Sequence, residues 1–136
     1  MTAPATSTPL VPVSWGELLD KIAILQIKSE RVRAADAQKN IRTELDRLSA
    51  IAAERLRSDA RLQAACHRLK AINEKLWDIE DRIRDKERAK AFDADFVALA
   101  RGVYHSNDER AAVKREINLY TGSELIEEKQ YSDYGR

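Results

Sequence analysis

Residues 59–90 read DARLQAACHRLKAINEKLWDIEDRIRDKERAK, and this stretch decides the fold. Its apolar side chains recur at alternating intervals of three and four residues, the heptad spacing of a helix that packs along another helix. The apolar positions of this seam are Leu62, Ala65, Leu69, Ile72, Leu76, Ile79 and Ile83. A helix over 59–90 would be about 48 Å long at about 1.5 Å per residue, so it needs a partner of similar length.

The sequence on either side also predicts a protein made only of helices. No glycine or proline occurs from residue 17 to residue 101, and no proline follows Pro12. Because these two residues are the strongest helix breakers and the commonest turn formers, a β-rich fold would have few places to turn. We expect an antiparallel helical bundle or long helical hairpin of about four helices, at roughly 14–34, 37–57, 59–90 and 94–121.

Short polar residues mark the expected helix ends. Ser14 and Glu17 have the spacing of a capping box, in which each side chain bonds to the backbone amide of the other residue. We expect Asp36 to cap the second helix, Ser58 or Asp59 to cap the third, and Gly122 to end the fourth. A helix that continues through residues 57–59 is the alternative to the cap at Ser58 or Asp59. The heptad phase of the fourth helix continues through residues 105–108, so we expect that helix to be unbroken there.

The two ends of the chain differ from its middle. All three prolines lie within residues 1–13, which we expect to form a flexible arm. A chain of 136 residues has the length of one domain, and we expect a single helical domain over 14–130. After Gly122 the sequence is rich in acidic residues and tyrosine, which predicts a short helix to about Lys129 and an acidic, fraying tail over 131–136.

The composition bears on several classes of protein. Lys and Arg number 24 against 23 Asp and Glu, whereas a general nucleic-acid binder carries a basic stripe, so we expect no nucleic-acid partner. The single cysteine, Cys66, cannot form an intrachain disulfide, and with His67 and His105 it lacks the spacing of a zinc site. We therefore expect no metal and no cofactor. No run of about 18 apolar residues occurs, so we predict a cytoplasmic protein without membrane insertion.

Two polar residues interrupt the seam of the fourth helix. Ser106 and Arg110 occupy consecutive seam positions in a series that is otherwise mostly apolar from Phe96 to Tyr120. If the third and fourth helices pack as an antiparallel hairpin, residues whose numbers sum to about 183 face each other. Arg110 then faces Asn73, so a polar belt crosses an apolar hairpin.

This polar belt has two interpretations. Buried polar residues in a helical seam commonly fix register and oligomeric state, and this is the more frequent role. Alternatively, Arg110 and Lys114 bind an anionic group, because the planar guanidinium suits carboxylate and phosphate. Asn73 and Asn107 would then orient the ligand, and no catalytic residue is assigned. The candidate ligand-binding residues are Asn73, Trp77 as a wall, Glu80 as an acid or base, Asn107, Arg110 and Lys114.

Three stretches resemble one family of short bacterial proteins. They are VSWGELLDKIAILQIKSE over 13–30, LKAINEKLWDIEDRIR over 69–84, and ALARGVYHSNDERAAVKREIN with GSELIEEK within 96–129. In combination they are similar to the uncharacterised proteins of domain of unknown function family 6165. The resemblance implies an all-helical bacterial protein without an assigned activity, whose relatives occur near genes for glycosyltransferases and surface polysaccharide.

Two functional hypotheses follow. The first is a non-catalytic interaction or assembly protein, which forms a homo-oligomer or binds a protein partner. The family resemblance suggests surface-polysaccharide biosynthesis as its pathway. The alternative is a small all-α enzyme or anionic-metabolite binder that uses the polar belt. A closed salt bridge at Arg110 favours the first hypothesis. A pocket enclosed by Arg110, Asn73 and Glu80, with a second cation from the first helix, favours the alternative.

Overall fold

The computed structural model describes residues 7–135, and four helices occur in that range. They are α1 (Trp15–Arg31), α2 (Ala35–Arg55), α3 (Ala60–Arg88) and α4 (Ala94–Thr121). No strand is present between residues 7 and 135. The prediction of an all-helical fold is confirmed, and α4 is unbroken through residues 105–108.

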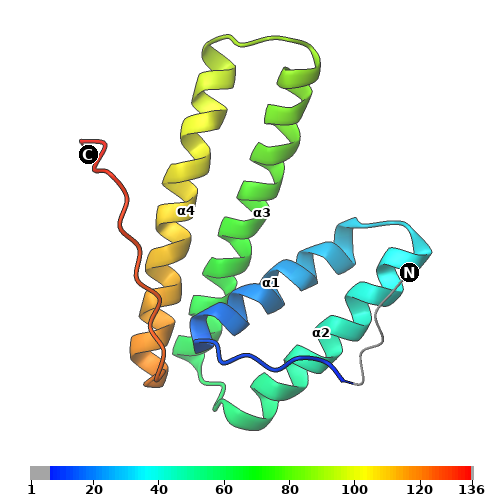
Figure 1. Cartoon of the computed structure of the whole chain (residues 1–136), viewed down its shortest axis with the longest axis vertical. Helices are drawn as coiled ribbons and strands as arrows, with labels where there is room; N and C mark the ends of the chain where they lie inside the picture. Colours follow the sequence, from blue (N-terminus) through cyan, green and yellow to red (C-terminus); the bar gives the residue numbers. More distant parts are fainter. Residues whose placement is uncertain (1–6, 136) are drawn as a thin grey trace.

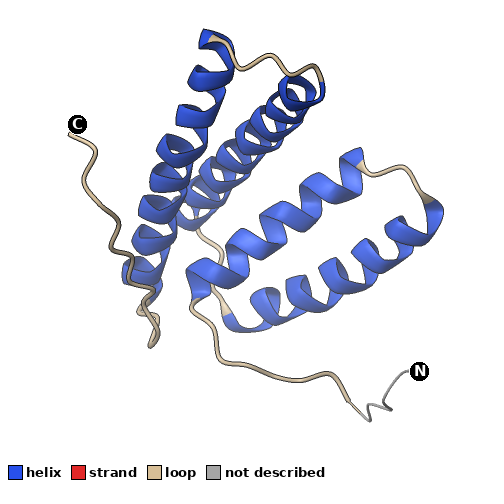
Figure 2. Cartoon of the chain, turned by 45° about the horizontal axis from the view of Figure 1, so that its top comes forward, coloured by secondary structure: helices blue, strands red, loops and turns tan. Residues whose placement is uncertain are grey.

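The four helices form two antiparallel pairs. α3 and α4 lie side by side as a long hairpin, and α1 and α2 form a shorter pair that lies obliquely across its lower part (Figure 1). α1 packs against each of the other three helices, whereas among the helices of residues 7–135 the backbone of α2 lies close to α1 alone. Figure 2 shows the two pairs diverging from the end at which α1 begins. The arrangement makes α1 the central helix of the fold.

The core lies where α1 meets the α3–α4 pair. Leu69 is fully buried there, and Ile117 is 1% exposed. The buried side chains of this cluster are Leu18, Leu19, Ile22, Ala23, Leu62, Ala65, Leu69, Val113 and Ile117. Ile72, Leu76 and Ile83 of the predicted seam are only partly buried. The seam is therefore correct in phase, but α4 is the main helical neighbour of its far half, which α1 reaches through Arg31 (Figure 1).

Most of the predicted caps are present. The Ser14 hydroxyl accepts a hydrogen bond from the Glu17 amide at 3.1 Å, and the Asp59 carboxylate accepts one from the Leu62 amide at 2.9 Å. Asp93 begins α4 in the same way, accepting from the Phe96 amide at 3.0 Å. Gly122 ends α4 in the left-handed region, with φ of 66°. These contacts satisfy amide groups that have no partner inside the helix.

The prediction of Asp36 as a cap is wrong. α2 begins directly after Ala34, which makes no side-chain cap. Gln38 closes the turn instead, because its side-chain amide donates to the carbonyl oxygens of Ser29, at 3.0 Å, and Val32. These carbonyls belong to the end of α1, so the turn is stabilised by satisfying the last carbonyls of the first helix.

The prediction of a short helix to Lys129 is also wrong. Residues 123–135 form no helix and run back along α4 (Figure 1). Glu127 and Glu128 pair with Lys114 and Arg115 of α4, and these contacts require an extended chain beside the helix. Part of the predicted flexible arm lies outside the described residues. Residues 7–13 form no helix, and Thr8 accepts a hydrogen bond from Arg47 of α2 at 3.2 Å.

None of the helices within residues 7–135 combines the length and the apolar character that crossing a lipid bilayer requires.

Candidate functional site

Asp20 of α1 is at the centre of the polar belt. Its carboxylate accepts hydrogen bonds from Nε of Arg110 at 2.9 Å and from Nη2 of the same side chain. Its Oδ1 also accepts from the side-chain amide of Asn73 at 2.9 Å. The side chain of Asp20 is only 1% exposed. The predicted register therefore brings Arg110 and Asn73 to the same place, and a third helix supplies the group that joins them.

Lys114 makes a second ion cluster one turn further along α4. Its Nζ lies 2.6 Å from the Glu17 carboxylate of α1 and 3.5 Å from that of Glu127 in the C-terminal segment. The Lys114 side chain is 8% exposed. Glu17 therefore pairs with α4 instead of completing the predicted capping box with Ser14. This cluster links α1, α4 and the C-terminal segment.

The pKa shifts of Arg110 and Glu127 both favour the charged forms of these side chains. The hydrogen bonds from Arg110 to Asp20 raise the pKa of the guanidinium above its ordinary value, although burial acts in the opposite direction. Burial would raise the pKa of Glu127, but Lys114 and Lys129 together lower it below the ordinary value. Neither group is held in an uncharged form that could donate or remove a proton near neutral pH.

The start of α1 rests directly on the end of α4. The Gly16 amide donates to the Asn118 side chain at 2.7 Å, and the Trp15 amide donates to the Ser123 hydroxyl at 3.3 Å. Asn118 is 2% exposed. A Cβ at Gly16 would stand 2.5 Å from the carbonyl oxygen of Lys114, so the absence of a side chain permits this approach.

Trp77 and Glu80 do not join the Asp20 cluster. The guanidinium carbon of Arg31 lies 5.7 Å from the centre of the Trp77 ring. Glu80 pairs with Arg84 on the exposed side of α3. No hydrogen bond or ion pair connects either of them to Arg110 within residues 7–135. Their role in ligand binding, like that of the other candidate residues, stays a prediction.

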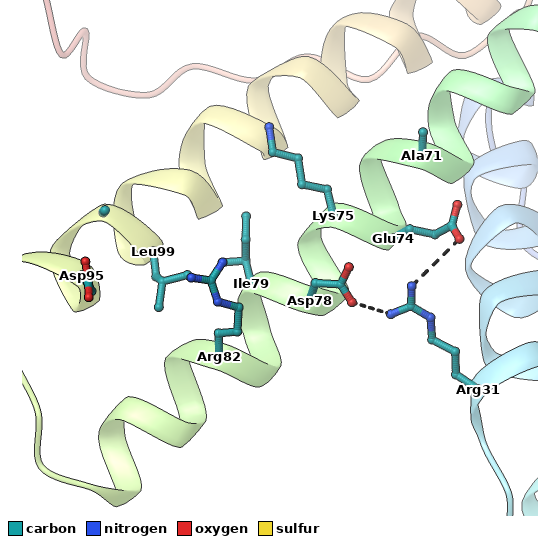
Figure 3. A pocket seen from close by; sticks show the side chains of 10 residues that line it. Arg31, Ala71, Glu74, Lys75, Asp78, Ile79, Arg82, Asp95 and Leu99 are labelled. Atoms are coloured by element: carbon teal, nitrogen blue, oxygen red, sulfur yellow. Dashed lines mark hydrogen bonds and ion pairs between the residues drawn. The ribbon is translucent and has the colours of Figure 1, made fainter.

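Several depressions lie near the belt residues, and a small one between α4 and the C-terminal segment is lined by Lys114. Two larger ones bear on the function. One, of about 730 Å³, extends across α3 from Arg31 of α1 to the beginning of α4, over a floor that includes Ile79 and Leu99 (Figure 3). The other is a larger groove of about 1160 Å³ between α4 and the C-terminal segment, and Asn107 and Arg110 line it. The belt itself is not an enclosed pocket, because the Asp20 carboxylate already accepts hydrogen bonds from Nε and Nη2 of Arg110.

Metal-ligating and nucleophilic groups are dispersed. Across residues 7–135 no three His, Cys, Asp or Glu side chains come together as a metal site would require. Cys66 is partly buried, and burial raises the pKa of its thiol above the ordinary value. A thiol of this kind is a poor nucleophile, because the reactive form is the thiolate.

The comparisons with known proteins identify the family. A family model described as "Family of unknown function (DUF6165)" matches residues 10–134. The chain belongs to this family. Comparison with curated proteins and with solved structures gave no match. The matched range of this DUF6165 protein includes Asp20, Asn73, Arg110 and Lys114, so the ion clusters lie within the family domain.

Asp20 is the important residue that sequence reasoning missed. It follows Leu18 and Leu19 on a broad apolar helix face and is buried with them. An acidic residue between apolar ones on an inward face was the available signal, since a buried carboxylate requires a partner. The identity of that partner depended on how α1 crosses α3 and α4, which periodicity does not give.

Proposed function

We propose that this DUF6165 protein is a non-catalytic interaction protein that assembles with a second copy through the part of its α3–α4 pair that α1 leaves uncovered. The observation that carries the proposal is that, within residues 7–135, α1 covers only the lower part of this pair (Figure 1). Within residues 7–135, α1 packs on both α3 and α4, whereas the backbone of α2 lies close to neither of them. A long hairpin with a half-covered seam is stabilised when a second hairpin covers it.

The total surface area supports association. The chain exposes 9955 Å², whereas a compact monomer of 15.5 kDa exposes about 7,200 Å². A permanent homodimer buries about 2,000–5,000 Å² in total, so the chain has enough surface for such an interface.

We place the interface at the depression shown in Figure 3, which we call the α3–α4 depression. Its apolar floor contains Ala71, Ile79, Ala98 and Leu99. Its rim carries charges of both signs, from the acidic residues Glu74, Asp78 and Asp95 and the basic residues Lys75 and Arg82. No salt bridge within residues 7–135 uses Lys75 or Arg82. The acids pair within the copy, Glu74 and Asp78 with Arg31 and Asp95 with Lys86. Across a two-fold axis, Lys75 and Arg82 of one copy would share these acids with the other copy.

The closed ion pair at Arg110 counts against the enzyme alternative. Two of its N–H groups bond to Asp20, and the Lys114 ammonium lies between two glutamates. An anionic substrate would have to replace these internal carboxylates, one of which is almost completely buried. Such pairs fix how helices cross, which is the structural role of polar residues in a seam. The link to surface polysaccharide rests on the family resemblance alone and stays a prediction.

Size-exclusion chromatography with light scattering tests the assembly. We expect the wild-type chain to have twice its monomer mass of 15.5 kDa. Ala98→Glu puts a charge on the floor of the depression at an exposed position, so it should yield a folded monomer. Ala50→Glu, at an exposed position of α2, is the matched control and should remain a dimer.

Two results would overturn this proposal. One is a wild-type mass that stays at 15.5 kDa as the concentration is raised. The other is a dimer that survives Ala98→Glu, which would exclude the α3–α4 depression as the interface. Far-ultraviolet circular dichroism of both variants shows whether the helices remain formed.

A further inference from the structure

The C-terminal segment is attached to α4 at two separate places. Near its beginning, Glu127 and Glu128 pair with Lys114 and Arg115. Near its end, the Tyr134 hydroxyl donates to the Asp108 carboxylate at 2.7 Å. The chain between these attachments spans the groove of about 1160 Å³, which we call the tail groove. Its volume slightly exceeds the range of about 300–1,000 Å³ that is typical of small-molecule sites.

Tyrosine rings form much of the wall of the tail groove. Tyr104 comes from α4, and Tyr131 and Tyr134 come from the C-terminal segment. The ring centres of Tyr104 and Tyr134 are 5.1 Å apart. Tyr131 is 78% exposed. Aromatic faces carry negative charge density, so a group of rings of this kind attracts a cation.

Elsewhere this chain places its own arginines over aromatic rings. Arg31 lies over Trp77 and Arg61 over Tyr120, with guanidinium carbons 5.7 Å and 4.3 Å from the ring centres. No arginine or lysine within residues 7–135 lies over the ring of Tyr131 in this way. The tail groove thus offers an aromatic face of the kind that arginine covers at two other places.

The charges around the tail groove favour a cation as well. The segment 123–135 has four acidic residues, and two of them, Glu127 and Glu128, already pair with Lys114 and Arg115 of α4. Asp108 and Asp133 stand among the lining residues. Arg110 also lines the groove, but Asp20 neutralises it. Lys129 is paired with Glu127.

We propose that the tail groove binds an arginine side chain from a protein partner. The guanidinium would stack on the tyrosine rings while its N–H groups face the acidic side of the groove. Arginine fits better than lysine, because its planar group is weakly hydrated and stacks on aromatic faces. This inference rests on the proposed function, an interaction protein, and names a class of partner for a surface other than the α3–α4 depression.

A peptide titration of the full chain tests this assignment. The probe is a capped arginine–glycine–arginine peptide, and the readout is the change in amide NMR shifts of isotope-labelled protein. Tyr131→Ala should weaken the binding by about 2- to 30-fold, the range of one cation–aromatic contact. Tyr131→Phe keeps the ring and should bind within about 2-fold of the wild type. Because Tyr131 is exposed, both variants should fold.

The controls separate the possible outcomes. A capped glutamate–glycine–glutamate peptide should not bind, and added salt should weaken the arginine peptide. The proposal is overturned if the arginine peptide does not shift residues 103–111 and 129–134, or if Tyr131→Ala binds it unchanged. Methylguanidine that binds as tightly as the peptide would assign the groove to small cations instead. The Ala98→Glu variant should still bind the peptide, so failure of the dimer and failure of the tail groove are separate results.

Discussion

A single buried carboxylate, that of Asp20, holds three helices in register. It comes from α1, and it accepts hydrogen bonds from Arg110 of α4 and Asn73 of α3. Removing one partner of a buried pair leaves the other without compensation, which commonly costs about 3–5 kcal/mol. Arg110 is 28% exposed, so water screens part of this loss.

Asp20→Ala should lower the free energy of unfolding by about 3 kcal/mol, because it leaves the Arg110 guanidinium and the Asn73 amide without their acceptor. Urea denaturation of Asp20→Ala, Arg110→Ala and the double variant measures the effect. The two single losses should not add, since either substitution removes the same pair. Additive losses would contradict the structural role given to this pair.

Of the two residues in the Asp20–Arg110 ion pair, the sequence predicted only Arg110 as a polar residue in the seam. The interruption of the α4 seam indicated Arg110, and hairpin geometry indicated Asn73 as its neighbour. Asp20 was not predicted, because periodicity along one helix shows which side chains face inward but not what they meet. Likewise, Lys114 was identified as a possible anion-binding residue, whereas its glutamate partners come from α1 and from the C-terminal segment.

Among the elements, α1 and α4 make the closest backbone approach described above. Gly16 stands where a Cβ would be 2.5 Å from the carbonyl oxygen of Lys114 and 2.9 Å from the Asn118 side chain. At Gly102 the nearest atom is the terminal methyl carbon of Ile79, at 3.1 Å. A backbone carbonyl inside a helix cannot move aside easily, whereas the end of an isoleucine side chain can change its position.

Gly16→Ala should therefore destabilise the protein by about 2 kcal/mol, even though alanine is normally the better helix former. Gly102→Ala is the matched comparison, and we expect its stability to stay within about 1 kcal/mol of the wild type. Thermal unfolding followed by circular dichroism measures both variants. Equal stability of the two alanine variants would show that α1 does not begin as close to α4 as described.

The elements themselves were largely predictable. Apolar spacing gave four helices, and the caps at Ser14, Asp59 and Gly122 followed from local chemistry. The two errors have a common physical cause. Gln38 and the glutamates of the C-terminal segment make contacts with a neighbouring helix that local propensity does not include.

At the scale of the whole molecule, the chain is a long hairpin with a shorter helical pair against one side of it (Figure 2). Sequence periodicity predicted that α3 requires a partner of its own length, and α4 is that partner. Periodicity did not predict that α1 would cover only part of the pair, because this depends on the angle at which α1 crosses it. The uncovered part is where the proposed assembly would form.

A distance between two copies tests this assembly most directly. Nitroxide labels are attached at Lys75→Cys, on the rim of the α3–α4 depression, in a Cys66→Ala background. Pulsed electron–electron double resonance then measures the distance between labels on two copies. We expect a defined distance between labels on two copies, and this distance should disappear when labelled chains are diluted with unlabelled ones. The same label at Lys39→Cys, exposed on α2, should give a longer or unresolved distance. The absence of dipolar coupling between labels at position 75 on different copies would contradict the proposed assembly.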